Sequence, residues 1–384
     1  MAVINRIAAF AGDMRAWRQH LHAHPELGFA CHETAAFVAA RLRAFGVDEI
    51  HGGFAESGLV ALIEGQGPGA TIGLRADMDA LPITEHTGAP YASTADGVMH
   101  ACGHDGHTTM LLGAARYLAE TRAFSGRVAL IFQPAEEEGG GARVMAQEGM
   151  LERFGISAVY ALHTAPGQAE GSFVTMPGAM CAGNATFHIH VRGHGGHAAR
   201  PDEARDPIPP ALAIAQAMPS IVSRNRNAFA DLVISVTQIH AGTAENIIPD
   251  QVYINGTVRA YSDAVIDMVE ARMTEIVAGH GAAFAVDAKL EYVRDYPPMI
   301  NDADKAAFAA EVARELVDAV DPAGQREMGS EDFAYLLRER PGAYLRIGQG
   351  PGPALHHPEF DFNDAIAPIG ASFLARLVER AQPI

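Results

Sequence analysis

Residues 127–137 read RVALIFQPAEE, an apolar run typical of a buried strand that ends in a proline and two carboxylates. The stretch AVYALHT at 158–164 repeats that layout and ends in a histidine. With a helix expected at about 106–122, strands alternate with helices, and this alternation predicts an α/β fold with a largely parallel sheet. Open sheets of this kind place their sites at the carboxyl ends of the strands, where these polar residues stand.

On both sides of this stretch, the alternation of strands and helices continues toward the ends of the chain. Apolar residues at helical spacing predict a helical segment over 13–46, which ends at Gly46. The remaining elements are expected as strands at 57–65, 71–79 and 343–348 and as helices at about 303–319 and 364–380. We find no tandem repeat and no low-complexity segment.

The pattern changes between residues 181 and 294. The order of elements there is βαββαβ, which is typical of a ferredoxin-like module. Its strands are expected at 185–193, 231–242, 251–261 and 283–294, and its helices at about 207–227 and 263–280. We therefore predict two domains, one formed by residues 1–180 with 295–384 and a second, 181–294, inserted into it.

Composition narrows the functional class. The chain has 384 residues, which suggests two domains, and its 48% apolar and 19% charged residues suit a globular protein with a sizeable core. A net charge of -18 disfavours nucleic acid and anionic membranes as partners. The N-terminus has no apolar stretch long enough to export or anchor the chain, and three scattered cysteines cannot form a disulfide framework. We expect a cytoplasmic protein.

Four short segments carry side chains that can bind a metal. They supply Cys102 and His104 in MHACGHDGH, Glu136 and Glu137 in FQPAEEE, His163 at the end of AVYALHT, and His356 in LHHPEF. A thiolate with imidazoles suits zinc or another late divalent metal. Adjacent carboxylates at a strand end face different ways, so one can bind metal while its neighbour accepts a proton.

Each of these residues also has an ordinary explanation. A lone histidine is more often a surface or core residue, a glutamate run is usually a solvated face, and Cys102 could be a small buried hydrophobe. The combination favours the metal site, because all the candidates stand at segment ends and the glutamates follow a strand and a proline. Glu138 and His357 leave the register open by one position at two of the segments.

The chain resembles a known family through a series of motifs in a fixed order. They are RQHLHAHPELGF (18–29), LRADMDALPI (74–83), MHACGHDGH (99–107), FQPAEEEGGGA (132–142), GHGGHAARPDEARDPI (193–208), GTAENIIPD (242–250), GTVRAY (256–261), MGSEDFA (328–334) and LHHPEFDFND (355–364). Together they are similar to the amidohydrolase branch of the aminoacylase and carboxypeptidase superfamily of metallopeptidases, which includes hippurate hydrolases, N-acyl-amino-acid hydrolases and auxin-amino-acid hydrolases.

The resemblance implies a cofactor of two divalent metal ions, which could be zinc, manganese, cobalt or nickel. Cys102 would bridge the two ions, His104 and His163 would complete one site, and Glu137 and His356 would complete the other. Asp77 would support a ligand without itself binding metal. For Asp79, a role of that kind and a simple turn after the strand are equally good explanations.

The resemblance also implies the reaction, the hydrolysis of an N-acyl amino acid to a carboxylic acid and an amino acid. Glu136 would be the general base for a metal-activated water, and His197 would stabilise the oxyanion. The inserted domain would be a lid and dimerisation domain, and the protein a homodimer in which His197 reaches the partner's site. Asn246 and Arg259 are the candidates for binding the carboxylate of the small-molecule substrate.

Three alternatives stay open. A metallo-dipeptidase or carboxypeptidase would use the same site on a peptide bond, although Cys102 in the bridging position favours the acyl-amino-acid branch. A non-catalytic binding protein would be free to lose Glu136. A hydrolase with Cys102 as nucleophile and His104 as base would leave Glu136, Glu137 and the remaining histidines unexplained.

Overall fold

The computed structural model describes residues 3–384, and its contacts divide the chain into two compact units. Unit 1 comprises the residues up to Gly178 together with Ile300–Gln325 and Asp332–Ile384. Unit 2 comprises Ala179–Met299 and the short segment Arg326–Glu331. The sequence prediction had put that short segment in the first domain. No helix among residues 3–384 is long and apolar enough to cross a membrane.

Unit 1 is built on an eight-stranded sheet with the order β1-β2-β4-β3-β5-β16-β6-β15. Its strands are β1 (Glu49–Phe54), β2 (Gly58–Glu64), β3 (Thr71–Asp77), β4 (Arg127–Gln133), β5 (Ile156–Ala165), β6 (Phe173–Val174), β15 (Val320–Asp321) and β16 (Gly342–Gly348). The central strands β4, β3, β5 and β16 are parallel, whereas β1, β2 and β6 pair antiparallel with their inner neighbours. The expected α/β fold with a largely parallel sheet is confirmed.

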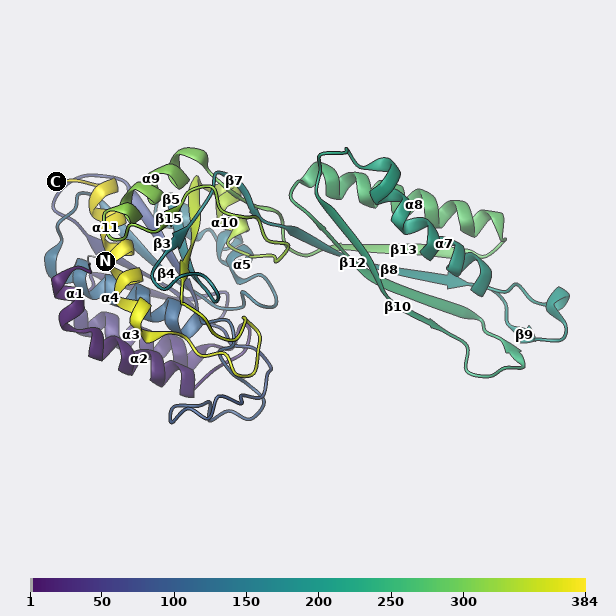
Figure 1. Ribbon diagram of the computed structural model, residues 1–384, viewed down its shortest axis with the longest axis horizontal. Coiled ribbons are helices and arrows are strands. Elements are labelled where there is room, and N and C mark those ends of the chain that lie inside the picture. The colour runs from purple at the N-terminus through teal and green to yellow at the C-terminus, as the bar shows by residue number, and fades with distance from the viewer. Residues whose placement is uncertain (1–2) are drawn as a thin grey trace. The chain divides into compact units, whose positions relative to one another are not determined.

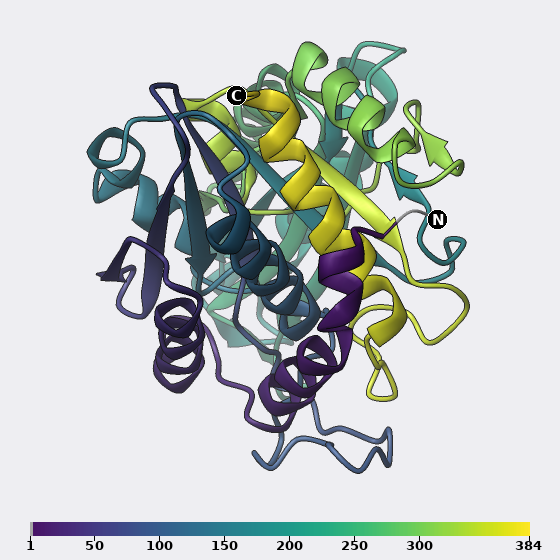
Figure 2. The ribbon, with the colours of Figure 1, turned by 90° about the vertical axis from the view of Figure 1, so that its left-hand side faces the viewer.

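Helices lie on both sides of this sheet (Figure 1). They are α1 (Asn5–Ala9), α2 (Ala11–Ala23), α3 (His32–Phe45), α4 (His104–Thr121), α5 (Gly141–Gln147), α6 (Met150–Arg153), α9 (Ala303–Arg314), α10 (Ala334–Glu339) and α11 (Ala367–Ala381). Figure 2 looks onto the layer that contains α1 and α2 (purple) and α11 (yellow). Every residue of β3 is buried, as expected for a strand that is covered on both faces.

The continuous helical segment predicted over 13–46 is wrong. The structure has α2 and α3 there, separated by residues 24–31. Pro25 removes a backbone donor and Gly28 adopts φ +52, so the sequence HPELGFA ends one helix and turns the chain before the next. The apolar spacing continued through the break because both helices pack against the same core.

Unit 2 has a four-stranded antiparallel sheet with the order β10-β12-β8-β13. Its elements are β8 (Gly183–Arg192), β9 (Gly196–His197), α7 (Ile208–Ser220), β10 (Leu232–Ala241), β11 (Ile247–Ile248), β12 (Gln251–Ala260), α8 (Asp263–Ala283) and β13 (Asp287–Arg294). Alternate residues of β8 and β12 enter a core that they share with α7 and α8. Apart from the short strands β9 and β11, which pair with each other, the order is the predicted βαββαβ. Short strands β7 (Gly178–Cys181) and β14 (Met299–Asn301) lie where the chain passes between the units.

Candidate active site

The polar side chains of unit 1 that can do chemistry gather where its central parallel strands end. Their positions follow the fold: Asp77 and Asp79 at the end of β3, Glu136 and Glu137 after β4, His163 in β5, Cys102 and His104 around the start of α4, and His356 after β16. A tight turn precedes α4, because Gly103 has φ +84 and a Cβ there would lie 2.6 Å from Cγ2 of Thr164. Only glycine fits this turn, which brings Cys102 and His104 to the same centre.

Two groups of possible ligand atoms share Cys102. In one group the atoms of Cys102, His104 and His163 all lie within 4.8 Å of one another, and in the other those of Cys102, Glu137 and His356 do. The Cys102 Sγ lies 3.5 Å from Nε2 of His163, and Nε2 of His356 lies 3.4 Å from Oε1 of Glu137. A thiolate shared by two such groups could bridge two ions.

The hydrogen bonds of the two buried histidines leave the correct nitrogen free for a metal. His104 donates from Nδ1 to the carbonyl of Asp79 at 2.8 Å, and His163 donates from Nδ1 to the carbonyl of Thr164 at 2.7 Å. Each neutral ring therefore has its lone pair on Nε2. Within residues 3–384, Nε2 of His104 and Oε1 of Glu137 are buried without a hydrogen-bond partner. Buried polar atoms seldom lack a partner, so these atoms fit a site for divalent cations.

The thiol of Cys102 needs a cation to ionise. Burial raises its pKa well above the ordinary value, and the carboxylates of Glu137 and Glu136 raise the pKa further. A bound divalent cation offsets both effects, because a thiol that coordinates such an ion is deprotonated. The same neighbours that disfavour a free thiolate therefore favour metal ions beside it.

Glu136 lies in the candidate site but differs from Glu137 in its surroundings. Glu136 is buried and its Oε1 accepts a hydrogen bond from the backbone N–H of Asp332 at 3.4 Å. Ala135, just before it, has φ +57, and His356 has φ +64, conformations that residues with a side chain rarely adopt. Strained backbone thus occurs next to the candidate base and at a candidate ligand. The extra glutamate, Glu138, is exposed and outside both groups.

The two aspartates of the RADMD segment make different contacts. Asp77, predicted to support a ligand, accepts a 2.6 Å hydrogen bond from Nδ1 of His107 and lies 3.8 Å from His104. His107 in turn accepts the N–H of Thr164 at Nε2, so Asp77 supports the backbone beside His163. Asp79 holds the glutamate pair directly.

The carboxylate of Asp79 accepts the backbone N–H groups of both Glu136 and Glu137 at 3.0 Å. Its carbonyl also orients His104. Asp79 therefore fixes the candidate base and two candidate ligands. The alternation in DMD, which puts both aspartates on one side of an extended segment, was the only sequence signal for this role, and that signal did not separate it from a turn.

His197, Asn246 and Arg259 lie in unit 2. His197 is exposed on β9 and accepts the N–H of Ala199 at Nδ1, so the neutral ring has its proton on Nε2 and can donate it. Asn246 is exposed, and its carbonyl accepts the N–H of Ala198. Arg259 is half-buried on β12 and donates to Oγ of Ser330 at 2.6 Å. Within the described residues it has no ion pair, so a carboxylate ligand would find free donors there.

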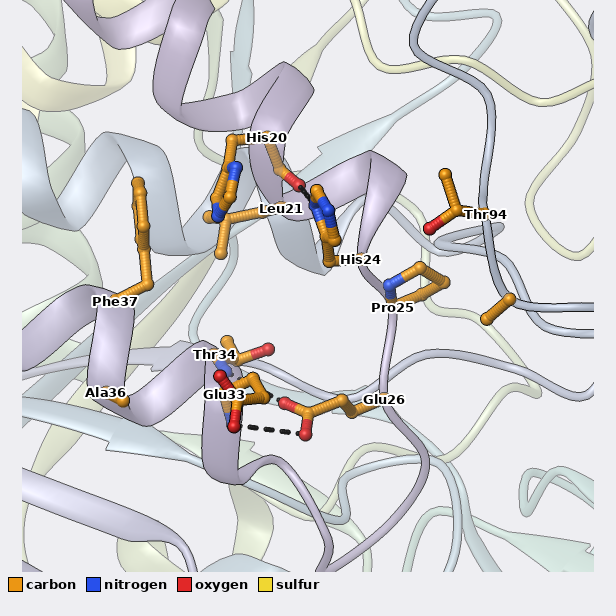
Figure 3. Close-up of a pocket in the computed structure, with 11 residues that line it drawn as sticks. His20, Leu21, His24, Pro25, Glu26, Glu33, Thr34, Ala36, Phe37 and Thr94 are labelled. Atoms are coloured by element: carbon orange, nitrogen blue, oxygen red, sulfur yellow. Dashed lines mark hydrogen bonds between the residues drawn. The ribbon is translucent and has the colours of Figure 1, made fainter.

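A separate pocket of about 560 Å³ lies between α2 and α3 (Figure 3). His20 and His24 face Thr34 and Glu26 across it. Glu26 accepts the backbone N–H groups of Glu33 and Thr34, so it caps the start of α3. None of these side chains belongs to a candidate metal group among residues 3–384.

Comparison with known proteins places this arrangement in context. The family model described as peptidase family M20/M25/M40 matches residues 73–380. The chain is 38% identical to a hippurate hydrolase of Campylobacter jejuni over 98% of both chains. It is 39% identical to an N-acetyl-L-cysteine deacetylase of Bacillus subtilis, over 93% of this chain and 85% of that one. The YxeP protein of Bacillus subtilis, described as a dinuclear metal binding peptidase, has a TM-score of 0.87 and 32% identity over 98% of this chain and 99% of its own.

Proposed function

The chain belongs to peptidase family M20/M25/M40, and we propose that its activity within that family is metal-dependent hydrolysis of N-acyl amino acids to a carboxylic acid and a free amino acid. Two of its relatives are named for reactions of this kind, hippurate hydrolysis and N-acetyl-L-cysteine deacetylation. The observation that carries the proposal is the pair of ligand groups that share Cys102 beside a buried Glu136. The chain is therefore an amidohydrolase that acts on small amino-acid derivatives.

The protein uses two divalent metal ions, and we propose Cys102, His104 and His163 as ligands of one and Cys102, Glu137 and His356 as ligands of the other. When bound, such ions polarise a carbonyl and make water acidic enough to attack it near neutral pH. The mixture of sulfur, nitrogen and oxygen donors suits zinc, while manganese, cobalt and nickel are the other candidates.

Glu136 is the proposed general base. Its carboxylate takes a proton from the attacking water, whose oxygen bonds to the acyl carbon, and returns that proton to the amide nitrogen as the C–N bond breaks. Its position favours this role, because its carboxylate lies close to possible ligand atoms of His104 and Glu137. His197, which can donate from Nε2, is proposed to hydrogen-bond the carbonyl oxygen as negative charge develops.

Arg259 and Asn246 are proposed to bind the carboxylate that every N-acyl amino acid carries. Arg259 supports this because its guanidinium is half-buried, uses one nitrogen on Ser330 and forms no ion pair within residues 3–384. An arginine of this kind favours a planar anion that can accept two parallel hydrogen bonds.

We also propose that the protein is a homodimer of the cytoplasm and that unit 2 is its lid and dimerisation domain. β10 is an edge strand of the unit 2 sheet and exposes Val233 and Ile239. A ten-residue edge strand with exposed apolar side chains favours pairing with another chain. A reducing compartment suits Cys102 as a ligand, and all three cysteines are buried and outside any disulfide.

The test is to strip the protein with chelator, restore zinc, manganese, cobalt or nickel in turn, and assay amine release. The substrates would be hippurate, N-acetyl-methionine, an indoleacetyl-amino acid and two dipeptides. Cleavage of an acyl-amino acid that depends on metal is the expected result. Cleavage of dipeptides alone would move the substrate class to peptides, and activity that survives chelation would support the cysteine nucleophile instead.

A further inference from the structure

Arg75, the first residue of the RADMD segment, is a buried arginine that contacts several charged and polar side chains. It is 3% exposed and uses all three guanidinium nitrogens. Nε donates to Gln133 at 2.7 Å, one Nη donates to Asp77 at 2.6 Å, and the other donates to Asp332 at 2.9 Å. A buried arginine normally needs one carboxylate to balance its charge. This one joins two carboxylates and an amide from three different segments, so its role exceeds charge balance.

Asp332 closes both ends of the loop that carries the glutamate pair. The loop runs from Gln133, the last residue of β4, to Ala142 at the start of α5. The side-chain amide of Gln133 donates to both Asp332 oxygens at 2.9 and 2.7 Å, and the backbone N–H of Ala142 donates to one of them at 2.9 Å. One buried carboxylate therefore fixes the start and the end of the loop.

Asp332 also reaches the candidate base itself, since its backbone N–H lies 3.4 Å from Oε1 of Glu136. The loop is thus held in its middle by Asp79 and at its two ends by Asp332. Asp332 is fully buried and its carboxylate pairs with the guanidinium of Arg75 at 2.9 Å, and a buried carboxylate stays ionised when a cation lies beside it. The arginine keeps the carboxylate ionised and in place.

We propose that Arg75 and Asp332 form a lock that positions the Glu136 loop for catalysis, with Arg75 acting through Asp332. Both are positioning residues, and neither belongs to the two ligand groups that share Cys102. This inference rests on the proposed function, because it assumes that Glu136 is the general base. A loop held at both ends keeps the carboxylate within reach of the water, and a displacement of about 1 Å can reduce a rate by about a hundredfold.

The test compares Asp332→Asn and Arg75→Lys with the parent enzyme, all loaded with metal. Asparagine keeps the shape of Asp332 but loses its charge. Its NH₂ group would also face the N–H donors of Arg75, Gln133 or Ala142. Lysine keeps the charge of Arg75 but cannot reach three acceptors at once. For both variants we expect kcat to fall by about ten- to a hundredfold while KM stays within about twofold. Each should retain two ions per chain and melt within a few degrees of the parent.

Arg75→Ala with added guanidinium gives an independent measurement. Its cavity can admit the planar cation, so millimolar guanidinium should restore kcat, and methylammonium should restore it much less. Arg127→Ala is the matched control, because Arg127 lies at the other end of β4 and bonds Thr71 and the backbone of Phe154. Its kcat should stay near that of the parent.

Glu136→Gln in the same assay separates the two proposals. If Glu136→Gln is inactive and Asp332→Asn and Arg75→Lys keep kcat within twofold, the lock is refuted and the proposed base stands. If Glu136→Gln itself turns over normally, the proposed base is refuted. Loss of kcat in proportion to lost metal or lost folded protein would also refute the lock, since it would show a structural role.

Discussion

Glu136 and Glu137 are neighbours in the chain but have different surroundings, so single substitutions should separate their roles. Glu136→Gln removes the proton acceptor but no ligand, and we expect turnover to fall by about 10²–10⁴ with both ions retained. Glu137→Gln neutralises the carboxylate whose Oε1 lies 3.4 Å from Nε2 of His356, so bound metal should fall as well. Metal analysis of both variants beside their rates checks the assignment, and metal loss from Glu136→Gln would reverse the two roles.

Asp79 gives a second prediction at the residue scale. Asp79→Asn keeps the size of the side chain, but its amide group must face one of the two backbone N–H donors of Glu136 and Glu137. We expect kcat to fall by about ten- to a hundredfold, because a donor facing a donor displaces the loop. Asp96→Asn is the control, because Asp96 is exposed and belongs to no candidate metal group among residues 3–384. Steady-state kinetics that show only a change in KM would contradict this role.

Sequence reasoning identified the candidate ligands because their chemistry is visible in the residue types. It did not find His107, Gln133 or Arg75 as parts of the site, since each acts through a partner far away in the chain. The bonds of Asp332 to Gln133 and Ala142 likewise appear only in the fold. Supporting residues of this kind have no local pattern that separates them from ordinary core polar groups.

At the scale of elements, α2 is tied to the start of α4 by a buried ion pair that should depend on pH. His22 of α2 bonds Asp105 at 2.7 Å and Glu85 at 3.3 Å. Burial lowers the pKa of His22, but these carboxylates outweigh burial and raise the pKa to about 10. In the unfolded chain His22 loses its proton near pH 6.5. The stability that its ion pair adds to the fold is therefore fully present below that pH and is lost as the pH rises toward 10.

We therefore expect the parent to lose on the order of 2 kcal/mol more stability between pH 6.5 and 10 than His22→Gln does. Thermal or denaturant unfolding of both proteins across this range measures the difference. Glutamine keeps a hydrogen bond to Asp105 without titrating. Parallel pH profiles for the two proteins would show that His22 is not protonated in the fold.

The elements themselves were predictable where the apolar period was clear, as in β3, β4, β5 and α4. The break between α2 and α3 was missed because its apolar positions continue the helical spacing through Pro25. The edge strand β1 was also missed, since EIHGGF contains two glycines and few apolar residues and is held by pairing with β2. Tertiary contacts, which no local pattern reports, decide such segments.

At the scale of the whole molecule, the proposed homodimer gives a further prediction. Ile239 is 46% exposed on β10, and lysine at such an edge opposes pairing. Ile239→Lys should shift the protein from dimer to monomer in sedimentation at micromolar concentration. If His197 serves the partner's site, the monomer should also lose most of its turnover while keeping its metal. An unchanged dimer would show that another surface forms the contact, and an active monomer would show that His197 acts within its own chain.

Asp332 also stands at a particular place in the chain, because Arg326–Glu331 clusters with unit 2 and the next residue belongs to unit 1. The sequence could not reveal this excursion, since six residues are too few to carry the pattern of a domain. Their membership comes from contacts such as that of Ser330 with Arg259. Asp332, the first residue after the chain returns to unit 1, is therefore also the residue that contacts both ends of the Glu136 loop.

The left-handed backbone of Ala135 has a consequence for how this enzyme can evolve. The residue is fully buried at φ +57, where a methyl group costs about 1 kcal/mol or more and a branched side chain costs more still. Glycine would remove that strain, but it would also widen the range of conformations open to the segment before Glu136. Mutational drift at this position is therefore confined to a narrow set of small residues. Stability favours glycine at this position, whereas a fixed position for Glu136 favours alanine. A library that varies the acyl specificity should therefore keep Ala135 unchanged.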